Sequence, residues 1–339
     1  MSSLSYIQLK GSSFELGVQL GQWGAAAFHQ HLLPSPVWAQ LEQWRDSDAI
    51  TQMQSVVQTN FPFIWDELQG LAQGLQIPFE DAFIWNSRGD LWAMAPDSCS
   101  SVLQLQPYPR ITHNEDGDPG FYGACAIAAF TPHQGPRFTS FVYPGSIAGH
   151  TFAANEHQLV MSVNNIRALF TLPGVPRMVL CRAILQCRSV AEAVELLQSQ
   201  PRSGAFNLNL GDSSGAIHSV EFNQAAVSSL AISAPYFHAN HAIHTDMRNY
   251  PQIITGSSGY RQIQGDQRVA QQTQVEPLAI LGDDSHPRFP IYRREPSDTD
   301  NENTIATADF RYGPTGLEWE VYDGPLHEPV WRFKGLTCL

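Results

Sequence analysis

One of the cysteines lies where the predicted secondary structure changes from helices to strands. Residues 97–105 read Asp-Ser-Cys-Ser-Ser-Val-Leu-Gln-Leu, with the cysteine at position 99. Upstream of it the spacing of apolar residues predicts helices, and downstream short apolar runs between turns predict strands. A cysteine reacts as its thiolate, and its ordinary pKa of about 8.5 means that a nucleophilic Cys99 needs a group to take its proton.

Cleavage of the peptide bond before Cys99 would supply that group. The new α-amine, with an ordinary pKa of about 8, can accept the proton of its own side chain, so no histidine partner is needed. Ser98, Ser100 and Ser101 are small and leave room around the scissile carbonyl. We therefore predict that Cys99 is a nucleophile and that the chain cuts its own Ser98–Cys99 bond. The alternative is an inert, buried cysteine at the start of a strand.

The composition is that of a globular protein with a substantial core. The chain has 339 residues, of which 43% are hydrophobic and 15% charged, and its net charge is −13. This acidic charge disfavours binding to nucleic acid or to an anionic membrane surface. No apolar run reaches the roughly 20 residues of a membrane helix, and residues 1–6 lack the pattern of a secretory leader. We expect neither nucleic acid nor membrane as a partner.

The five cysteines are few and odd in number and do not resemble a disulfide framework, which predicts a reducing, cytoplasmic location. Cys181 and Cys187 lie six positions apart with no histidine pair at ligand spacing, so the sequence predicts no metal site there. No organic cofactor is indicated. Whether the chain forms a homo-oligomer is left open.

Secondary structure follows from periodicity and capping residues. An edge strand is expected over residues 5–10, and Gly74 is expected to end the fourth helix. Ser189 and Glu192 are typical of a capping box. Helices are expected over residues 14–33, 37–46, 48–59, 61–75, 78–86, 176–185, 189–197, 259–273 and 277–281. Strands are expected over residues 99–105, 109–114, 121–130, 137–143, 149–154, 158–164, 206–211, 216–222, 226–232, 304–311 and 317–323. This order favours stacked sheets with helices outside.

Taken in order, the motifs of residues 11–333 resemble the penicillin acyltransferase-type family of N-terminal-nucleophile hydrolases, which is related to the choloylglycine hydrolases. Two departures are visible: Ser98 stands where the family usually has glycine, and Glu115 where it has an aromatic residue. The resemblance rests on these segments: Gly11-x-x-x-Glu15-x-Gly17, Glu67-Leu68-x-Gly70-x-Ala72-x-Gly74, Trp85-Asn86-Ser87-Arg88, Cys99-Ser100-Ser101, His113-Asn114-Glu115-Asp116, Gly174-Val175-Pro176-Arg177, Asn209-Leu210-Gly211-Asp212-x-x-Gly215 through Glu221, His238-Ala239-Asn240-His241, Ile291-Tyr292-Arg293 and Thr304-Ile305-Ala306.

The resemblance implies an α+β fold, a four-layer αββα sandwich of N-terminal-nucleophile hydrolase type with a helical N-terminal pro-segment. Residues 1–98 would be that pro-segment, which stays associated as a small subunit and is thus a partner of the rest. Residues 99–339 would be the catalytic segment.

The resemblance also implies roles for four residues. Cys99 would be the nucleophile, Asp116 would hold its α-amine, and Asn240 would donate to the oxyanion. Arg293 would support Asp116 and Cys99 electrostatically, with the adjacent Arg294 as an alternative. From the strand pattern alone, Asn164 and Asn165 could contact substrate or simply form a turn.

The implied function is an autoprocessing amidohydrolase that cleaves a linear, non-peptide carbon–nitrogen bond through an acyl-enzyme on Cys99. One alternative is an acyltransferase that moves an acyl group from a small amide or acyl-thioester to an amine, because both reactions share the acyl-enzyme. A second is an unprocessed, non-enzymatic binding protein on the same fold. A papain-like protease is disfavoured, because Cys99 precedes a strand and not a helix.

Overall fold

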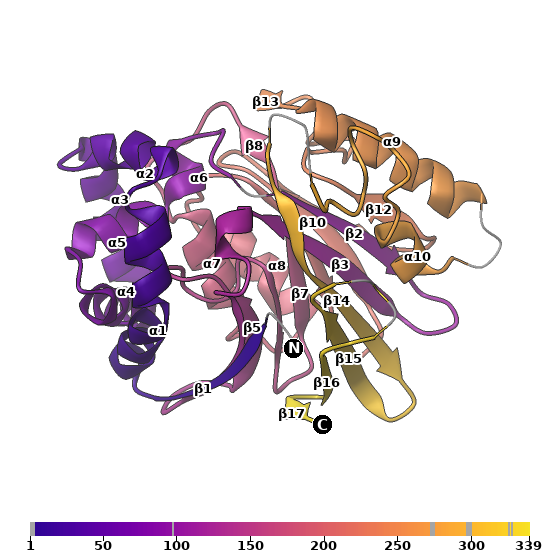
Figure 1. Cartoon of the computed structure of the whole chain (residues 1–339), viewed down its shortest axis with the longest axis horizontal. Helices are drawn as coiled ribbons and strands as arrows, with labels where there is room; N and C mark the ends of the chain where they lie inside the picture. Colours follow the sequence, from indigo (N-terminus) through magenta and orange to yellow (C-terminus); the bar gives the residue numbers. More distant parts are fainter. Residues whose placement is uncertain (1–3, 97, 272–274, 296–299, 325, 327) are drawn as a thin grey trace.

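The computed structural model describes residues 4–96, 98–271, 275–295, 300–324, 326 and 328–339. Within these residues the chain forms two large β-sheets that pack face to face, and helices cover both outer faces (Figure 1). Phe152 from one sheet packs edge-on against Phe310 from the other, with 6.2 Å between ring centroids. The predicted four-layer αββα arrangement is therefore confirmed.

The larger sheet has eight strands. The strand β1 lies at one edge of this sheet and pairs in parallel with β4. The predicted edge strand is thus confirmed. In sheet order, the strands are β1 (Ser5–Gly11), β4 (Ala126–Pro132), β5 (Phe138–Val142), β6 (Phe152–Asn155), β7 (Val160–Asn165), β9 (Phe206–Gly211), β10 (Ile217–Phe222) and β11 (Val227–Ala231).

The smaller sheet has seven strands and carries the segment around Cys99. In sheet order, they are β12 (Tyr236–His238), β2 (Ser98–Gln104), β3 (Arg110–Gly117), β14 (Asn303–Gly313), β15 (Gly316–Tyr322), β16 (Trp331–Lys334) and β17 (Thr337–Cys338). A separate two-stranded sheet pairs β8 (Arg167–Ala168) with β13 (Gln252–Ile253). The pattern of the sequence did not predict β8, β12, β13, β16 or β17, which are all short.

The helices fall into three groups. The first group lies beside the larger sheet and comprises α1 (Ser13–Ala27), the π-helix η1 (Phe28–Leu32), α2 (Pro36–Leu41), the 3-10 helix η2 (Glu42–Trp44), α3 (Asp48–Asn60), α4 (Pro62–Leu75), α5 (Phe79–Trp85) and α6 (Arg88–Leu91). The second comprises α7 (Arg177–Ile184) and α8 (Val190–Ser199), which pack on that sheet. The third comprises α9 (Gly256–Gln271) and α10 (Pro277–Leu281), which cover the smaller sheet. No helix among the described residues combines the length and apolar character needed to cross a bilayer.

Some predicted boundaries are wrong for local reasons. The strand expected over 121–130 begins only at Ala126, because the 3-10 turn η3 (Pro119–Phe121) precedes it. The strand expected over 149–154 begins at Phe152. The end of the helix expected over 259–273 lies outside the described residues. Ser189 does cap α8, but the Glu192 carboxylate accepts from the Arg188 N–H, so the predicted capping box is incomplete.

Glycines hold α1 and α4 in close contact. A Cβ added at Gly17 would lie 2.0 Å from the Glu67 carbonyl oxygen, and one at Gly74 would lie 2.2 Å from the Val18 oxygen. The prediction that Gly74 ends α4 is wrong, because this glycine serves the helix contact. That helix continues to Leu75, and Gln76 caps it in a left-handed conformation with φ of 59°.

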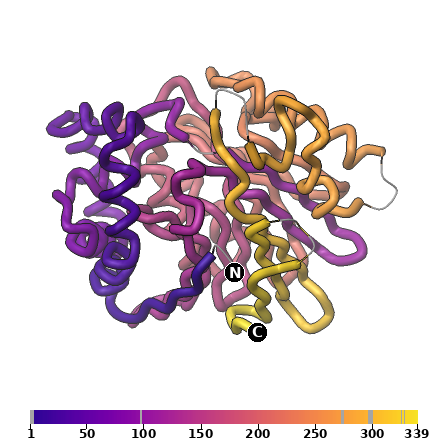
Figure 2. Tube along the Cα trace, viewed as in Figure 1, coloured from indigo at the N-terminus to yellow at the C-terminus, as the bar shows by residue number. Residues whose placement is uncertain are grey.

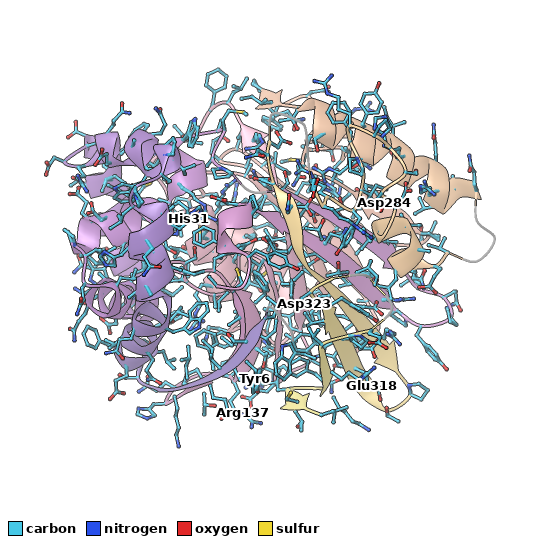
Figure 3. The ribbon with its side chains drawn as sticks, in the orientation of Figure 1. Tyr6, His31, Arg137, Asp284, Glu318 and Asp323 are labelled. Atoms are coloured by element: carbon cyan, nitrogen blue, oxygen red, sulfur yellow. The ribbon has the colours of Figure 1, made fainter. Side chains whose placement is uncertain are left out.

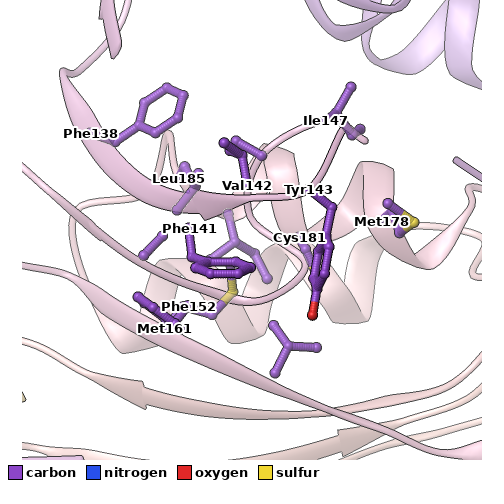
Figure 4. Packing of buried hydrophobic residues seen from close by; sticks show 14 of the residues in the cluster. Phe138, Phe141, Val142, Tyr143, Ile147, Phe152, Met161, Met178, Cys181 and Leu185 are labelled. Carbon is purple, nitrogen blue, oxygen red and sulfur yellow. The ribbon is translucent and has the colours of Figure 1, made fainter. Parts of the chain in front are cut away.

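The first 98 residues contact the rest of the chain at several places. The trace in Figure 2 brings β1 beside the last strands, where the Tyr6 and Trp331 rings lie 5.5 Å apart. Figure 3 labels Tyr6 and also His31, whose Nε2 lies 2.8 Å from Asp118 Oδ2. Figure 4 shows residues of α7 in one buried cluster with residues of β5, β6 and β7.

Candidate active site

Cys99 is the second residue of β2, a strand that contacts the larger sheet on one face and α9 on the other. On one face Ser101 Oγ reaches Asn164 Oδ1 on the larger sheet at 2.8 Å. On the other face Ser100 Oγ accepts from Arg261 on α9 at 2.9 Å. Alternate residues of a strand share a face, so the Cys99 side chain points with that of Ser101 between the two sheets.

The backbone of Cys99 is held on both sides. With the chain intact, its N–H donates to Asn240 Oδ1 at 3.0 Å, and its carbonyl accepts from the Arg261 guanidinium at 2.6 Å. Arg261 also donates to Asn240 Oδ1, at 2.6 Å. Two donors therefore identify Oδ1 as the acceptor, which leaves Nδ2 of Asn240 as a donor.

The loop after β12 presents Asn240 to Cys99. The Glu221 carboxylate on β10 accepts from the N–H groups of Ile243 and His244, and its Oε1 lies 2.9 Å from His238 Nε2. The Asn240 N–H donates to Ser258 Oγ at 3.0 Å. The His-Ala-Asn-His motif is thus anchored, and its asparagine reaches Cys99.

The thiol of Cys99 faces a carboxylate. The two residues are opposite one another in the β2–β3 pairing, and Sγ lies 3.6 Å from Glu115 Oε2. His113 Nε2 lies 3.3 Å from the same oxygen, and its Nδ1 lies 2.8 Å from Ser101 Oγ. Burial lowers the pKa of His113 to about 3, so its ring is neutral near pH 7.

Asp116 and Arg293 lie together on the other side of Ser98. Ser98 is opposite Asp116 in the strand pairing, and Thr304 donates to Asp116 Oδ1 at 2.7 Å. The Arg293 guanidinium lies 3.9 Å from Asp116 Oδ2 and 3.3 Å from Glu302 Oε2. By contrast, the Arg294 side chain is 60% exposed and lies 3.6 Å from Asp284. Of the two arginines, the structure places Arg293 beside Asp116.

Glu302 belongs to this cluster and is fully buried. Burial raises its pKa to about 7, although Arg167, Arg293 and the Ser98 hydroxyl act in the opposite direction. The sequence analysis did not single out Glu302, because nothing in the residues around it indicates burial.

The two asparagines at the end of β7 are buried and bonded within the protein. Asn164 Oδ1 accepts from Ser101 and from Asn209, while its Nδ2 donates to the His238 carbonyl. Asn165 Oδ1 accepts from Arg177, and its carbonyl accepts from Asn240 Nδ2 at 3.3 Å. These contacts favour a positioning role over the predicted contact with substrate.

A cleft opens next to Asp116, between the N-terminal helices and the end of β3. Residues on both sides of the predicted cleavage site contribute to it, including Gly117 and Asp118 from one side and Trp85, Arg88 and Pro96 from the other. The remaining lining residues are Leu32, Val37, Phe121 and Tyr143. A ligand bound there would contact both segments.

One group of side chains could hold a metal ion. The ligand atoms of Cys99, His113 and Glu115 lie within 4.8 Å of one another, and all three residues are buried. The sequence analysis predicted no metal site, because it examined the spacing of cysteines and not the pairing of β2 with β3.

Sequence reasoning also missed Arg261. It lies on a polar helix whose sequence shows no motif, yet it touches Cys99, Ser100 and Asn240. A buried arginine can be recognised only when the surface that covers it is known. The structure therefore places Asn240, Asp116 and Arg293 in the neighbourhood of Cys99, and adds Arg261, Glu115 and His113.

The chain is similar to several known proteins. Over 216 residues the chain is 26% identical to the beta-alanyl-dopamine/carcinine hydrolase of Drosophila melanogaster, a match that covers 56% of each chain. The chain thus spans little more than half the length of that relative. The structure of penicillin V acylase from Agrobacterium tumefaciens is similar to that of the present chain, with a TM-score of 0.43 and 11% identity, over 68% of this chain and 84% of the acylase. A mutant of conjugated bile acid hydrolase from Clostridium perfringens gives a TM-score of 0.43 and 10% identity, over 67% of this chain and 89% of the hydrolase.

The family model for acyl-coenzyme A:6-aminopenicillanic acid acyl-transferase matches residues 108–321. The match begins downstream of Cys99 and includes Asp116, Asn240 and Arg293. Because it covers more than half of the chain, the chain belongs to the acyl-coenzyme A:6-aminopenicillanic acid acyl-transferase family.

Proposed function

We propose that this protein cuts itself at Ser98–Cys99 and then hydrolyses small linear amides through an acyl-enzyme on Cys99. One observation carries the proposal: the N–H and C=O groups of Cys99 are both held by buried side chains, and its thiol faces a carboxylate. An inert cysteine at the start of a strand needs none of these contacts. Family membership supports the same chemistry.

Self-cleavage begins in a chain that has no α-amine at Cys99, so another group must take the thiol proton. Glu115 Oε2, at 3.6 Å from Sγ, is placed to accept it. Sulfur then adds to the Ser98 carbonyl carbon, the carbon–nitrogen bond breaks, and the nitrogen of Cys99 takes up a proton. The resulting thioester is hydrolysed by water, which leaves a carboxylate on Ser98 and restores the thiol.

The mature site uses the new α-amine. The amine accepts the thiol proton, and Asp116 stabilises its charged form with support from Arg293. Cys99 attacks the substrate carbonyl, the amine product leaves with a proton, and water releases the acid. Asn240 Nδ2 donates to the oxyanion, an interaction typically worth about 3 kcal/mol in the transition state.

A second reaction is acyl transfer, which the name of the family itself favours. An amine would then take the place of water in the last step. The relative from Drosophila melanogaster is named as a hydrolase of beta-alanyl-dopamine and carcinine. A substrate panel should therefore begin with these two amides and measure released acid with and without added amine.

The first experiment is intact mass spectrometry under denaturing conditions, with wild type beside Cys99→Ala and Cys187→Ala. Cys187 is also a free, buried cysteine, so its variant is a matched control. We expect wild type and Cys187→Ala to give the fragments 1–98 and 99–339, and Cys99→Ala to remain a single chain. An uncut wild type, or cleavage in Cys99→Ala, would refute self-cleavage, and the uncut result would favour the non-enzymatic binding protein.

A further inference from the structure

The thiol, imidazole and carboxylate around Sγ of Cys99 are the three ligand types that zinc binds in proteins. Two of their three separations match a zinc site, and the third, between Cys99 Sγ and His113 Nε2, is within 4.8 Å. Ligand bonds of about 2.3 Å to sulfur and about 2.0–2.2 Å to nitrogen and oxygen, at tetrahedral angles, place sulfur and oxygen about 3.6 Å apart and nitrogen and oxygen about 3.4 Å apart. The observed distances are 3.6 Å from Cys99 Sγ to Glu115 Oε2 and 3.3 Å from His113 Nε2 to that oxygen.

We propose that Cys99, His113 and Glu115 bind Zn²⁺ and that the bound ion blocks the nucleophile. Binding exchanges the thiol proton for the metal: Zn²⁺ enters, one proton leaves Cys99, and no electron is transferred. A thiolate, a carboxylate and a neutral imidazole around Zn²⁺ carry no net charge. This matters in a site where all three residues are buried, because an uncompensated charge would be costly there.

A second shell for His113 is already present. To coordinate through Nε2, the neutral ring must carry its proton on Nδ1, which lies 2.8 Å from Ser101 Oγ. Ser101 can accept that N–H because its own hydroxyl can donate to Asn164 Oδ1, also at 2.8 Å. Asn209 donates to the same Asn164 oxygen and keeps it in place. Such outer partners fix the tautomer and orientation of a ligating histidine.

The register of the sheet brings the trio together. Cys99 and Glu115 are opposite one another on adjacent strands, and His113 is two positions from Glu115 on the same face. The pairing of β2 with β3 therefore places the three ligand atoms around one point.

Cobalt titration of the purified protein tests the binding. Co²⁺ substitutes for Zn²⁺ and gives a thiolate-to-metal charge-transfer band together with the visible bands of tetrahedral coordination. We expect wild type and Cys187→Ala to show both, with Zn²⁺ abolishing them on addition. Cys99→Ala should lose the charge-transfer band, and Glu115→Gln and His113→Gln should each weaken binding at least about tenfold. Circular dichroism and thermal melting establish whether each variant is folded.

The binding and its consequence have separate readouts. Absence of a charge-transfer band in wild type, or a band that persists in Cys99→Ala, would overturn the inference. That Zn²⁺ inhibits catalysis rests on the proposed function. We expect added Zn²⁺ to stop self-cleavage and amide hydrolysis, and a chelator to restore them. A cobalt band in a chain that neither cuts itself nor hydrolyses amides would refute the proposed function but support the metal site. Cobalt binding to an enzyme whose activity Zn²⁺ does not change would refute the proposal that the metal blocks the nucleophile.

Discussion

At the scale of single residues, the candidate site is a set of polar groups that each meet a different atom of Cys99. Asn240 holds its nitrogen, Arg261 its oxygen and Glu115 its sulfur. These partners come from a loop, a helix and a strand. A change in any one of them should therefore affect a different atom of Cys99 first, although Arg261 and Asn240 also contact one another.

Arg261 is expected to position Cys99 for self-cleavage. It bridges three oxygen atoms, and a lysine keeps the charge but lacks the planar fork of donors. We expect Arg261→Lys to slow the loss of intact chain at least about tenfold, measured by mass spectrometry over time. Arg268→Lys, on the same helix but paired with Asp283, is the control and should cleave like wild type. Equal rates in both variants would contradict this role.

Glu115 is expected to accept the thiol proton while the chain is still intact. Replacing its carboxylate with an amide removes the proton acceptor but preserves the shape of the side chain. General bases typically contribute about 10²- to 10⁴-fold, so Glu115→Gln should slow self-cleavage by that order. Glu115→Asp retains a carboxylate at a longer distance and should cleave at an intermediate rate. If Glu115→Gln cuts itself at the wild-type rate, another group takes the proton.

Glu302 should give the folded chain a pH dependence. Its pKa is raised to about 7 by burial, against the nearby Arg167 and Arg293 and the Ser98 hydroxyl, while Asp300 acts in the same direction as burial. The folded state therefore keeps a proton that the unfolded state loses at lower pH. Its stabilising contribution is complete below about pH 4.5 and is lost as the pH rises to about 7.

Urea unfolding of Cys99→Ala, with and without Glu302→Gln, measures this contribution in an uncut chain. The quantity of interest is the free energy of unfolding with Glu302 minus that with Glu302→Gln. We expect this difference to fall as the pH rises from about 5 to about 7. It should then level off. A difference that stays flat across this range, or that grows with pH, would show that Glu302 does not retain its proton in the folded state.

At the scale of elements, glycine spacing decides how the N-terminal layer is built. Gly17 and Gly21 of α1 lie against Gly70 and Gly74 of α4, and at each of these positions a Cβ would come within 2.5 Å of the partner helix backbone. Close approach of this kind requires the absence of side chains and not the flexibility of glycine. The spacing of the glycines therefore permits the close crossing of α1 and α4.

Gly17→Ala should destabilise this crossing. The new methyl group would meet the Glu67 carbonyl at 2.0 Å and the Leu71 nitrogen at 2.7 Å, and backbone atoms cannot rotate away. Overpacking of this kind costs about 1–3 kcal/mol. Gly313→Ala, at a site with no heavy atom within 4 Å of the new Cβ, is the control and should change stability by less than about 0.5 kcal/mol. Thermal melting in the Cys99→Ala background measures both, and equal melting temperatures would argue against the close crossing.

At the scale of the whole molecule, residues 1–98 are built into the body of the protein. They supply β1 to the larger sheet, and the buried Glu67 on α4 pairs with the buried Arg182 on α7, with 2.8 Å between Glu67 Oε2 and an Arg182 nitrogen. Asp90 accepts from the backbone N–H of Arg177 at 3.1 Å. If the chain is cut at Ser98–Cys99, these contacts should keep the two segments together.

We expect the two fragments to elute together in gel filtration at neutral pH and to separate only in denaturant. Glu67→Gln leaves the Arg182 charge without its buried partner, and such losses typically cost about 3–5 kcal/mol. The variant should therefore dissociate at a clearly lower urea concentration than wild type. Glu42→Gln breaks an exposed pair with Arg45 and should not move the midpoint. Separation of the wild-type fragments without denaturant would contradict a stable small subunit.

The sequence by itself predicted most of β2, β3 and α9, because apolar periods are local, but it did not predict the short strand β12 that precedes Asn240. Through the family resemblance, it also proposed Cys99, Asp116, Asn240 and Arg293 as site residues. Only the tertiary structure shows which of the adjacent Arg293 and Arg294 lies beside Asp116. Arg293 is buried there, whereas Arg294 is exposed.

The tertiary structure also decided what surrounds the thiol. Asn240 and Arg261 meet Cys99 across separations of 141 and 162 residues, and the pairing of β2 with β3 sets Glu115 opposite it. Strand periodicity predicts which residues share a face, but not which strand lies alongside or which helix covers the sheet. Those choices depend on how the whole core packs, so the contacts of Arg261, Glu115 and His113 with the site became visible only in the folded chain.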